Sequence, residues 1–204
     1  LLPVMGGHRP DNLAALICNQ EPFAMTRHRL LCLGGARSGK SRYAQQRAEA
    51  AAGAPVFIAT AQAFDDEMHA RIARHRADRD ARWACVEAPI ALPQAIEALS
   101  GQGKVVLVDC LTLWLSNLML ADEDVDAAGD ALERAVAGFD GALILVANEV
   151  GWGIVPDNDL ARRFRDEAGR INQAIAAICD EVVLVAAGLP LALKRPGHPV
   201  YSHE

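Results

Sequence analysis

The stretch 30-LLCLGGARSGKS-41 decides the fold of this chain. Its first four residues are apolar, and residues 34–41 match the phosphate-loop pattern G-x-x-x-x-G-K-[ST] at every fixed position. Glycines let the backbone curl so that successive N–H groups face a polyphosphate, and the positive end of the following helix dipole faces the same point. Lys40 would then reach the β and γ phosphates. Ser41 would offer its hydroxyl to Mg²⁺, which prefers hard oxygen ligands.

The flanking residues supply the context that this motif requires. Residues 42–52 are strong helix formers, and Gly53 and Pro55 end the run. An apolar strand before the loop and a helix after it favour a nucleoside triphosphate site over a simple Gly-rich turn, so the sequence predicts binding of ATP or GTP. The expected phosphate contacts are Gly34, Gly35, Ala36, Arg37, Ser38, Gly39, Lys40 and Ser41.

Composition limits the class of protein. The 204 residues are 51% hydrophobic and 23% charged, with a net charge of −6, which is typical of one soluble globular domain. The negative charge argues against nucleic-acid binding, which needs a basic surface. No apolar run reaches the roughly 18 residues of a membrane helix. Cysteines without a C-x-x-C pair are expected to be small buried hydrophobes in a reducing cytoplasm, not zinc ligands or disulfides. They are Cys18, Cys32, Cys85, Cys110 and Cys179.

We predict three regions: a flexible N-terminal extension (1–28), one catalytic domain (29–194) and a polar tail (195–204). Residues 1–24 carry three prolines and two glycines but lack the charged start and apolar middle of a signal peptide. We therefore expect them to lie outside the folded domain, upstream of a start at Met25.

Strand and helix patterns alternate along the domain. Short apolar runs predict strands at 30–33, 56–60, 83–87, 105–109, 142–147 and 181–187. Helices are predicted at 42–52, 65–79, 92–99, 111–120 and 126–139, with a longer one after a cap at Asp157 or Asn158. This alternation predicts an α/β fold of the P-loop NTPase type, with three layers, a mostly parallel sheet and ligands at the carboxyl ends of the strands. The run 181–187 is expected to close the sheet, because Gly188 and Pro190 follow it.

The strand 105–109 ends in an acid, Asp109, after four apolar residues. A buried parallel strand with a carboxylate at its C-terminal end is the pattern of a Walker B strand. Paired with the upstream phosphate loop, this pattern predicts Asp109 as the metal partner of Ser41.

The predicted helix 65–79 begins with three acids and carries Met68, Ile72, His75 and Arg79 at the spacing of one helix face. Spacing alone favours a hydrogen-bonded structural histidine at His75 and leaves a functional role open.

Taken together, GGARSGKS, IAT, DDEM, RIARHR, VDCLT, NEVGWGIVP and RRFRDEAGRINQ resemble the bifunctional adenosylcobinamide kinase / adenosylcobinamide-phosphate guanylyltransferase family of cobalamin biosynthesis. The resemblance covers about Leu30 to Lys194. It implies phosphorylation of adenosylcobinamide by ATP or GTP, and then transfer of GMP from GTP to adenosylcobinamide phosphate. It also implies a homo-oligomer.

The resemblance further implies a covalent guanylyl-histidine in the pattern R-I-x-x-H-R, which is His75 here. A neutral imidazole can attack the α-phosphorus and expel pyrophosphate. Relatives can carry a second histidine next to this one, where this chain has Arg74, which leaves His75 as the only candidate in the motif. His69 is the fallback. The family's further nucleotide contacts correspond to Ala59, Thr60, Ala61, Arg76, Ala77, Asp78, Arg79, Glu87 and Asp109.

Three other readings stay open at this level. Another P-loop small-molecule kinase would share the loop and Asp109 but lack the covalent step. A GTPase switch is disfavoured, because residues 148–151 lack the N-K-x-D element expected for guanine recognition in that class. A nucleotide-gated assembly module would place the arginine-bearing helix after Asn158 against a neighbouring subunit.

Overall fold

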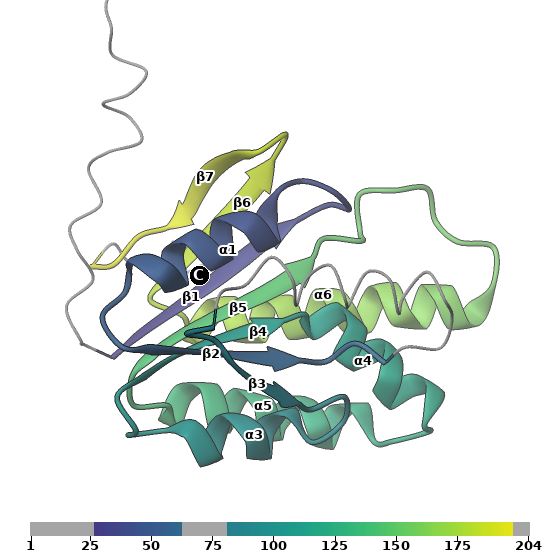
Figure 1. The fold of residues 1–204 in the computed structure, drawn as a ribbon. Coiled ribbons are helices and arrows are strands. Elements are labelled where there is room, and N and C mark those ends of the chain that lie inside the picture. Colours follow the sequence, from purple (N-terminus) through teal and green to yellow (C-terminus); the bar gives the residue numbers. More distant parts are fainter. Residues whose placement is uncertain (1–26, 63–80, 198–204) are drawn as a thin grey trace, which may run out of the picture.

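The computed structural model describes residues 27–62 and 81–197 (Figure 1). Within them one seven-stranded sheet has the order β3-β2-β4-β5-β1-β6-β7, and every neighbouring pair is parallel except β6 with β7. The strands are β1 (His28–Gly34), β2 (Ala54–Ala59), β3 (Ala84–Glu87), β4 (Lys104–Asp109), β5 (Ala142–Asn148), β6 (Glu181–Ala186) and β7 (Leu189–Lys194).

Helices cover both faces of this sheet. They are α1 (Lys40–Ala50), α3 (Leu92–Leu99), α4 (Leu111–Leu120), α5 (Val125–Gly138) and α6 (Asp159–Ile178). Figure 1 shows α1 on one face, with α3, α5 and α6 on the other. Two core clusters match these layers, one containing the buried residues of α1 and the other those of α3 to α6. The predicted three-layer α/β fold is confirmed.

The central strands are apolar on both sides because helices cover both faces. In β4, Val105 and Leu107 belong to the cluster under α1, whereas Val106 and Val108 belong to the opposite cluster. Side chains alternate along a strand, so this register directs Asp109 to the α1 face. On α1, the small buried residues Ala44 and Ala48 meet that face of the sheet.

Both ends of α6 are capped. Asn158 is the N-cap, and its side chain accepts a hydrogen bond from the Ala161 N–H at 2.8 Å. At the other end, Lys194 Nζ donates to the carbonyls of Ala176 and Ala177 at 3.1 and 2.8 Å. Carbonyls at a helix C-terminus lack intrahelical partners and favour a cation, so β7 helps to hold the end of α6.

The expectation that residues 181–187 close the sheet is wrong, because β7 extends the sheet by one antiparallel strand. Ala187 and Gly188 have φ of 51° and 79°, and two positive φ values make the tight turn that suits a two-residue hairpin. Pro190 does not end the sheet, contrary to the expectation from the sequence. It lies on the edge strand, where a missing N–H breaks no ladder bond if that side of the residue faces away from β6.

The cysteine prediction is partly wrong. Cys32, Cys110 and Cys179 are free and buried as expected, but Cys85 is free and exposed. It lies on β3, the edge strand, where the sheet is only partly covered. Cys18 lies outside the described residues.

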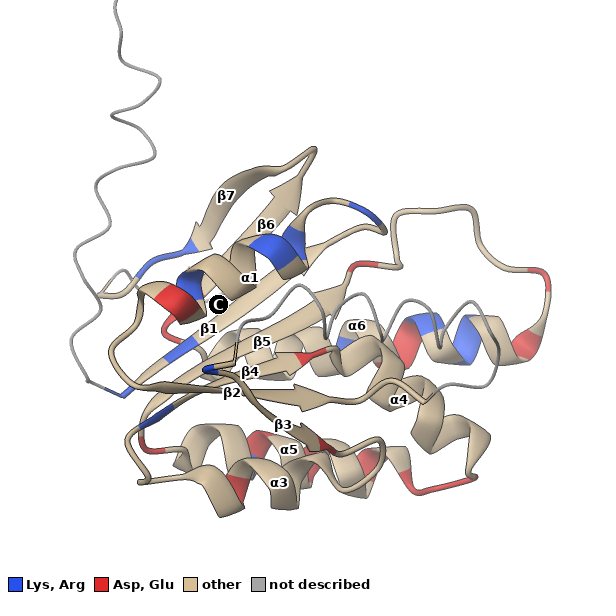
Figure 2. Cartoon of the chain, viewed as in Figure 1, with Lys and Arg blue, Asp and Glu red and all other residues tan. Residues whose placement is uncertain are grey.

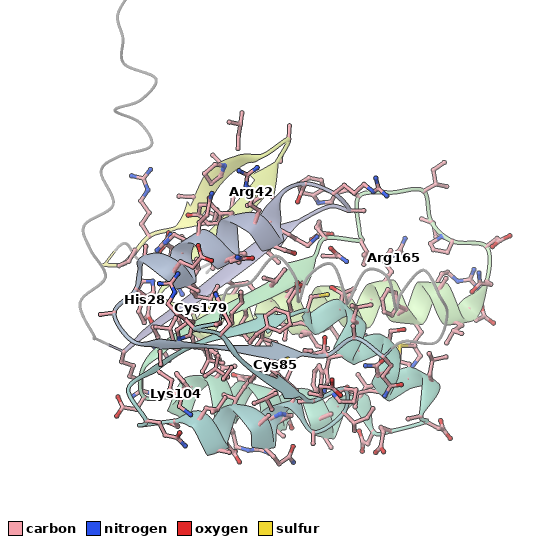
Figure 3. The ribbon with its side chains drawn as sticks, viewed as in Figure 1. His28, Arg42, Cys85, Lys104, Arg165 and Cys179 are labelled. Carbon is pink, nitrogen blue, oxygen red and sulfur yellow. The ribbon has the colours of Figure 1, made fainter. Side chains whose placement is uncertain are left out.

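A partly buried charged network fastens α1 to the amino edge of the sheet. Arg47 donates two hydrogen bonds to Glu181 at 2.9 and 2.8 Å, and its NH1 also donates to the Tyr43 hydroxyl at 2.8 Å. His28 Nε2 lies 3.3 Å from Glu181 Oε2. Figure 3 places His28 and Cys179 at this edge. Burial by itself would raise the pKa of Glu181, but the bonds from Arg47 and His28 outweigh burial and lower it to about 2.

This network predicts a pH-dependent stability. Glu181→Gln should lower the free energy of unfolding at pH 7 by about 2 kcal/mol, because it leaves the partly buried Arg47 without its carboxylate. The carboxylate of the wild type stabilises the fold above the ordinary pKa of 4.5, and that contribution is lost as the pH falls through about 2. Urea unfolding at a series of pH values should therefore show the two proteins converging between pH 4.5 and 2. A difference that stays constant over this range would contradict the assignment.

Within the two described ranges, no helix is long and apolar enough to cross a membrane. The predicted helix 65–79 and residues 1–26 of the predicted N-terminal extension (1–28) lie outside those ranges, whereas His28 already belongs to β1.

Candidate functional site

The phosphate loop joins the end of β1 to the start of α1 at the carboxyl edge of the sheet. A Cβ at Gly34 would lie 2.5 Å from both Ser38 Oγ and the Val185 carbonyl oxygen, so only glycine fits there. Gly39 has φ of +97°, a conformation that L side chains rarely adopt. The Gly188 N–H donates to the Ser38 carbonyl at 2.8 Å, so the β6–β7 turn braces the loop from outside.

Two side chains of the loop are arranged for an anion. Lys40 is 8% exposed, and its Nζ donates to the Gly35 carbonyl at 3.2 Å, which holds the ammonium group over the loop. Ser38 Oγ is buried and has no hydrogen-bond partner in the part of the chain that the structure describes. A buried hydroxyl without a partner is costly, and a phosphate oxygen in the loop would satisfy it.

Asp109 ends β4 at the same edge of the sheet. It pairs in register with Ala59 of β2 and Val146 of β5, and its side chain is directed to the α1 face. Ser41 lies in the first turn of α1, which covers that face. The two predicted metal ligands are thus on one side of the sheet and at one end of it. A carboxylate and a hydroxyl beside bound phosphates suit Mg²⁺, and the described ranges contain no cluster of three or more His, Cys, Asp or Glu that would suggest a denser metal centre.

Thr60 holds the strand ends of β2 and β4 together. It is fully buried, its hydroxyl donates to the Cys110 carbonyl at 2.8 Å, and the same hydroxyl accepts from the Cys110 N–H at 2.8 Å. Asn117 Nδ2 donates to the Thr60 carbonyl at 2.7 Å. These bonds fix the peptide that follows Asp109. Contact of Thr60 with a nucleotide stays a prediction.

The other predicted nucleotide contacts divide into two groups. Ala59 and Glu87 are register partners at the carboxyl ends of β2 and β3, and Ala61 follows two residues after β2. The residues from the basic motif, His75, Arg76, Ala77, Asp78 and Arg79, lie outside the described residues, so their roles stay predictions.

Cys110 is not a candidate nucleophile. Burial, reinforced by the adjacent Asp109 carboxylate, raises the pKa of its thiol to about 11. The thiol is therefore neutral near pH 7, and the thiolate is the reactive form.

The sequence analysis missed one residue of this edge, Asn148. It ends β5 and pairs with Gly34, whereas the sequence reading placed it in a loop, as the first residue of the motif NEVGWGIVP, and gave it no role of its own. The signal was present, because Asn148 ends an apolar strand just as Asp109 does.

Comparison with known families shows the family of this chain. The sequence profile of the family described as "Cobinamide kinase / cobinamide phosphate guanyltransferase" matches residues 30–193. The chain belongs to this family. Membership of the cobinamide kinase / guanyltransferase family makes it an enzyme, a bifunctional kinase and guanylyltransferase, as the resemblance implied.

Relatives within the cobinamide kinase / guanyltransferase family are similar over most of their length. "Bifunctional adenosylcobalamin biosynthesis protein CobP" of Pseudomonas aeruginosa is 49% identical over 172 residues, which are 83% of this chain and 98% of that protein. "Bifunctional adenosylcobalamin biosynthesis protein CobU" of Escherichia coli is 42% identical over 180 residues, covering 81% of this chain and 99% of that protein.

Solved structures support the fold of this family member and no more. A structure described as an ATPase domain superposes with a TM-score of 0.53 at 11% identity, covering 94% of this chain and 93% of that one. A protein from Pyrococcus horikoshii OT3 gives a TM-score of 0.50 at 9% identity, covering 84% of this chain and 88% of that one.

Proposed function

We propose that this chain phosphorylates adenosylcobinamide with ATP or GTP and then transfers GMP from GTP to adenosylcobinamide phosphate, giving adenosylcobinamide-GDP. The observation that carries the proposal is the phosphate loop of a family member, with Lys40 folded over it, the Ser38 hydroxyl unpartnered among the described residues and Asp109 at the same edge. Both steps begin with a nucleoside triphosphate, so a single loop can serve both.

In the kinase step, the substrate hydroxyl oxygen attacks the γ-phosphorus, and the bond to the bridging β-phosphate oxygen breaks. The hydroxyl proton is released, and a nucleoside diphosphate leaves. Catalysis of this reaction is mostly positioning and charge stabilisation. The loop N–H groups and Lys40 bind the phosphates, and the rigid backbone at Gly34 and Gly39 fixes their directions.

Ser41 and Asp109 would hold Mg²⁺, which when bound neutralises phosphate charge. The protein positions the carboxylate through the Thr60 bonds to Cys110, because these hold the peptide directly after Asp109.

In the guanylyl-transfer step, the proposed nucleophile is His75. Its imidazole attacks the α-phosphorus of GTP and pyrophosphate leaves; the phosphate of the substrate then attacks the same phosphorus and releases the histidine. The neighbouring Arg76 and Arg79 would stabilise the phosphate charge.

The first experiment is incubation with GTP labelled at the α-phosphate, without cobinamide, followed by denaturation and peptide mapping. Label on His75 that is labile to acid and stable to base supports the covalent step. Binding of GTP without label on the protein, and without labelled adenosylcobinamide-GDP when adenosylcobinamide phosphate is added, would favour a plain P-loop kinase.

Asp109→Asn should lower turnover of the kinase step by about a hundredfold or more at saturating substrate, because an amide is a weaker ligand for a hard cation. Turnover measured over a range of Mg²⁺ concentrations checks this. Asp140→Asn is the matched control, since Asp140 is exposed and directly precedes Gly141 and β5 at the amino edge. Unchanged turnover in Asp109→Asn would remove this carboxylate from the metal site.

We also propose that the enzyme is a cytoplasmic homo-oligomer. Leu189, Leu191 and Leu193 alternate along the edge strand β7 and are 71%, 59% and 55% exposed, so they form an apolar stripe that a second subunit could cover. A monomeric mass in light scattering would contradict the oligomer.

A further inference from the structure

Asn148 stands between the two halves of the proposed site. It ends β5, the strand that lies between β1, which carries the phosphate loop, and β4, which carries Asp109. Asn148 pairs in register with Gly34, the first glycine of the loop, while Asp109 pairs with Val146 two residues earlier. Val146 belongs to the cluster under α1, so the Asn148 side chain is directed to the face on which the loop and Asp109 meet.

The backbone of Asn148 is held by side chains from two helices. Its N–H donates to Thr112 Oγ1 of α4 at 2.7 Å, and its carbonyl accepts from Asn172 Nδ2 of α6 at 3.2 Å. Thr112 and Asn172 are 7% and 8% exposed. The next residue is tied to the loop, because the Glu149 N–H donates to the Gly34 carbonyl at 3.1 Å. Bonds to the backbone therefore fix Asn148 without using its own amide.

The Asn148 side chain is the exception among the asparagines that the structure describes. Asn117, Asn158 and Asn172 each bond to backbone through their side chains. In contrast, Asn148 Oδ1 is buried without a hydrogen-bond partner in the described ranges. A buried amide oxygen left unbonded is unfavourable and calls for an explanation beyond the fold itself.

We propose that the side-chain amide of Asn148 binds the terminal phosphate of the nucleoside triphosphate and positions it for transfer. This rests on the proposed use of the phosphate loop by a triphosphate. A half-turn of the amide exchanges its oxygen and nitrogen, so the same position can present the Nδ2 donor. Nδ2 then donates a hydrogen bond to a γ-phosphate oxygen, which is a charged acceptor and therefore a strong one. Because the backbone clamp holds Asn148 beside Gly34, the contact orients the γ-phosphorus toward the incoming hydroxyl at little further entropic cost.

The contact separates triphosphates from diphosphates. The loop N–H groups hold phosphates that both nucleotides share, and Lys40 would reach the β-phosphate of both as well as the γ-phosphate of the triphosphate. The Asn148 contact exists only with the triphosphate. Asn148 would thus add to the affinity for the kinase substrate without adding to the affinity for its product, which favours release of the diphosphate after transfer.

Calorimetric titration of the full chain with a non-hydrolysable ATP analogue and with ADP, both with Mg²⁺, tests the proposal. Asn148→Ala should raise the Kd of the analogue about tenfold or more and change the Kd of ADP less than twofold. Asn148→Asp keeps the shape but adds a charge, so it should weaken the analogue further. Thr112→Val removes the hydroxyl that holds the Asn148 N–H and should give a smaller loss with the same selectivity.

Asn158→Ala is the matched control, because it removes an asparagine side chain that only caps α6, and it should leave the ratio of the two Kd values unchanged. Equal losses for both nucleotides in Asn148→Ala would show a structural role, and no loss would show no contact; either result overturns the proposal. If Asn148→Ala does not fold, Asn148→Leu decides, since it keeps a similar shape and places neither a donor nor a charge beside the phosphates. The proposed function can fail separately. If Asn148→Ala weakens the ATP analogue but not ADP, while the wild-type protein does not turn over adenosylcobinamide, the proposed function is contradicted and the Asn148 contact is still supported.

Discussion

Lys40→Ala is expected to lower both phosphoryl transfer and guanylyl transfer by about a thousandfold or more. The ammonium group of Lys40 is held over the phosphate loop by its bond to the Gly35 carbonyl, and alanine leaves no cation at that point. In both reactions charge moves onto phosphate oxygens that this cation contacts, and removing one such group commonly costs several kcal/mol of transition-state stabilisation. Steady-state rates for each half reaction, measured separately with adenosylcobinamide and with adenosylcobinamide phosphate, provide the check.

Lys104→Ala is the matched lysine control. Lys104 begins β4 at the amino edge, which Figure 3 shows on the same side as His28 and away from Arg165. It should keep both activities. If Lys40→Ala retains either activity near the wild-type level, the two reactions use separate phosphate sites.

His75→Ala is expected to abolish guanylyl transfer and to keep phosphoryl transfer within a fewfold of wild type. The covalent intermediate needs a nucleophilic nitrogen, whereas the kinase step passes the phosphoryl group directly to the substrate hydroxyl. Chromatography of the products should show that adenosylcobinamide phosphate accumulates and that adenosylcobinamide-GDP is not formed.

His69→Ala is the matched control for His75→Ala, because it is the other histidine near the basic motif. Loss of guanylyl transfer in His69→Ala alone would move the nucleophile to that position. Normal guanylyl transfer in both single variants would remove the covalent histidine from this segment.

Local patterns were sufficient to predict most elements. The apolar spacing placed α3 at 92–99 and α4 at 111–120, which are the observed bounds. The phosphate-loop motif predicted the turn between β1 and α1, because its glycines are required by contacts within a few residues, such as that between Gly34 and Ser38. Strand order was not predicted, since parallel neighbours such as β1 and β5 are more than a hundred residues apart.

What sequence reasoning missed depends on distant partners. Proline often ends a strand. Pro190 is compatible with β7 because β7 is an edge strand of the sheet. Sequence reasoning assigned no role to Asn148 itself, because Thr112 and Asn172, which fix its backbone, are 36 and 24 residues away along the chain.

Charge on the surface is uneven. Figure 2 shows mainly acidic residues on α3 and α5 and residues of both signs on α6, whereas Lys and Arg occur on α1 and in the loop before it. The acidic residues of α3 and α5, on the far side of the sheet from α1, account for part of the net charge of −6 without opposing nucleotide binding at the phosphate loop.

The fork between Arg47 and Glu181 has a consequence for affinity. Helix α1 carries Lys40 and Ser41 in its first turn, and Arg47 in its last turn binds Glu181 of β6. A shift of α1 would therefore break these partly buried charged bonds. The loss of conformational freedom in this helix is therefore complete when the chain folds, before any nucleotide arrives. Nucleotide binding then loses little conformational entropy in this helix. More of the attraction between the loop and the phosphates therefore contributes to the binding free energy.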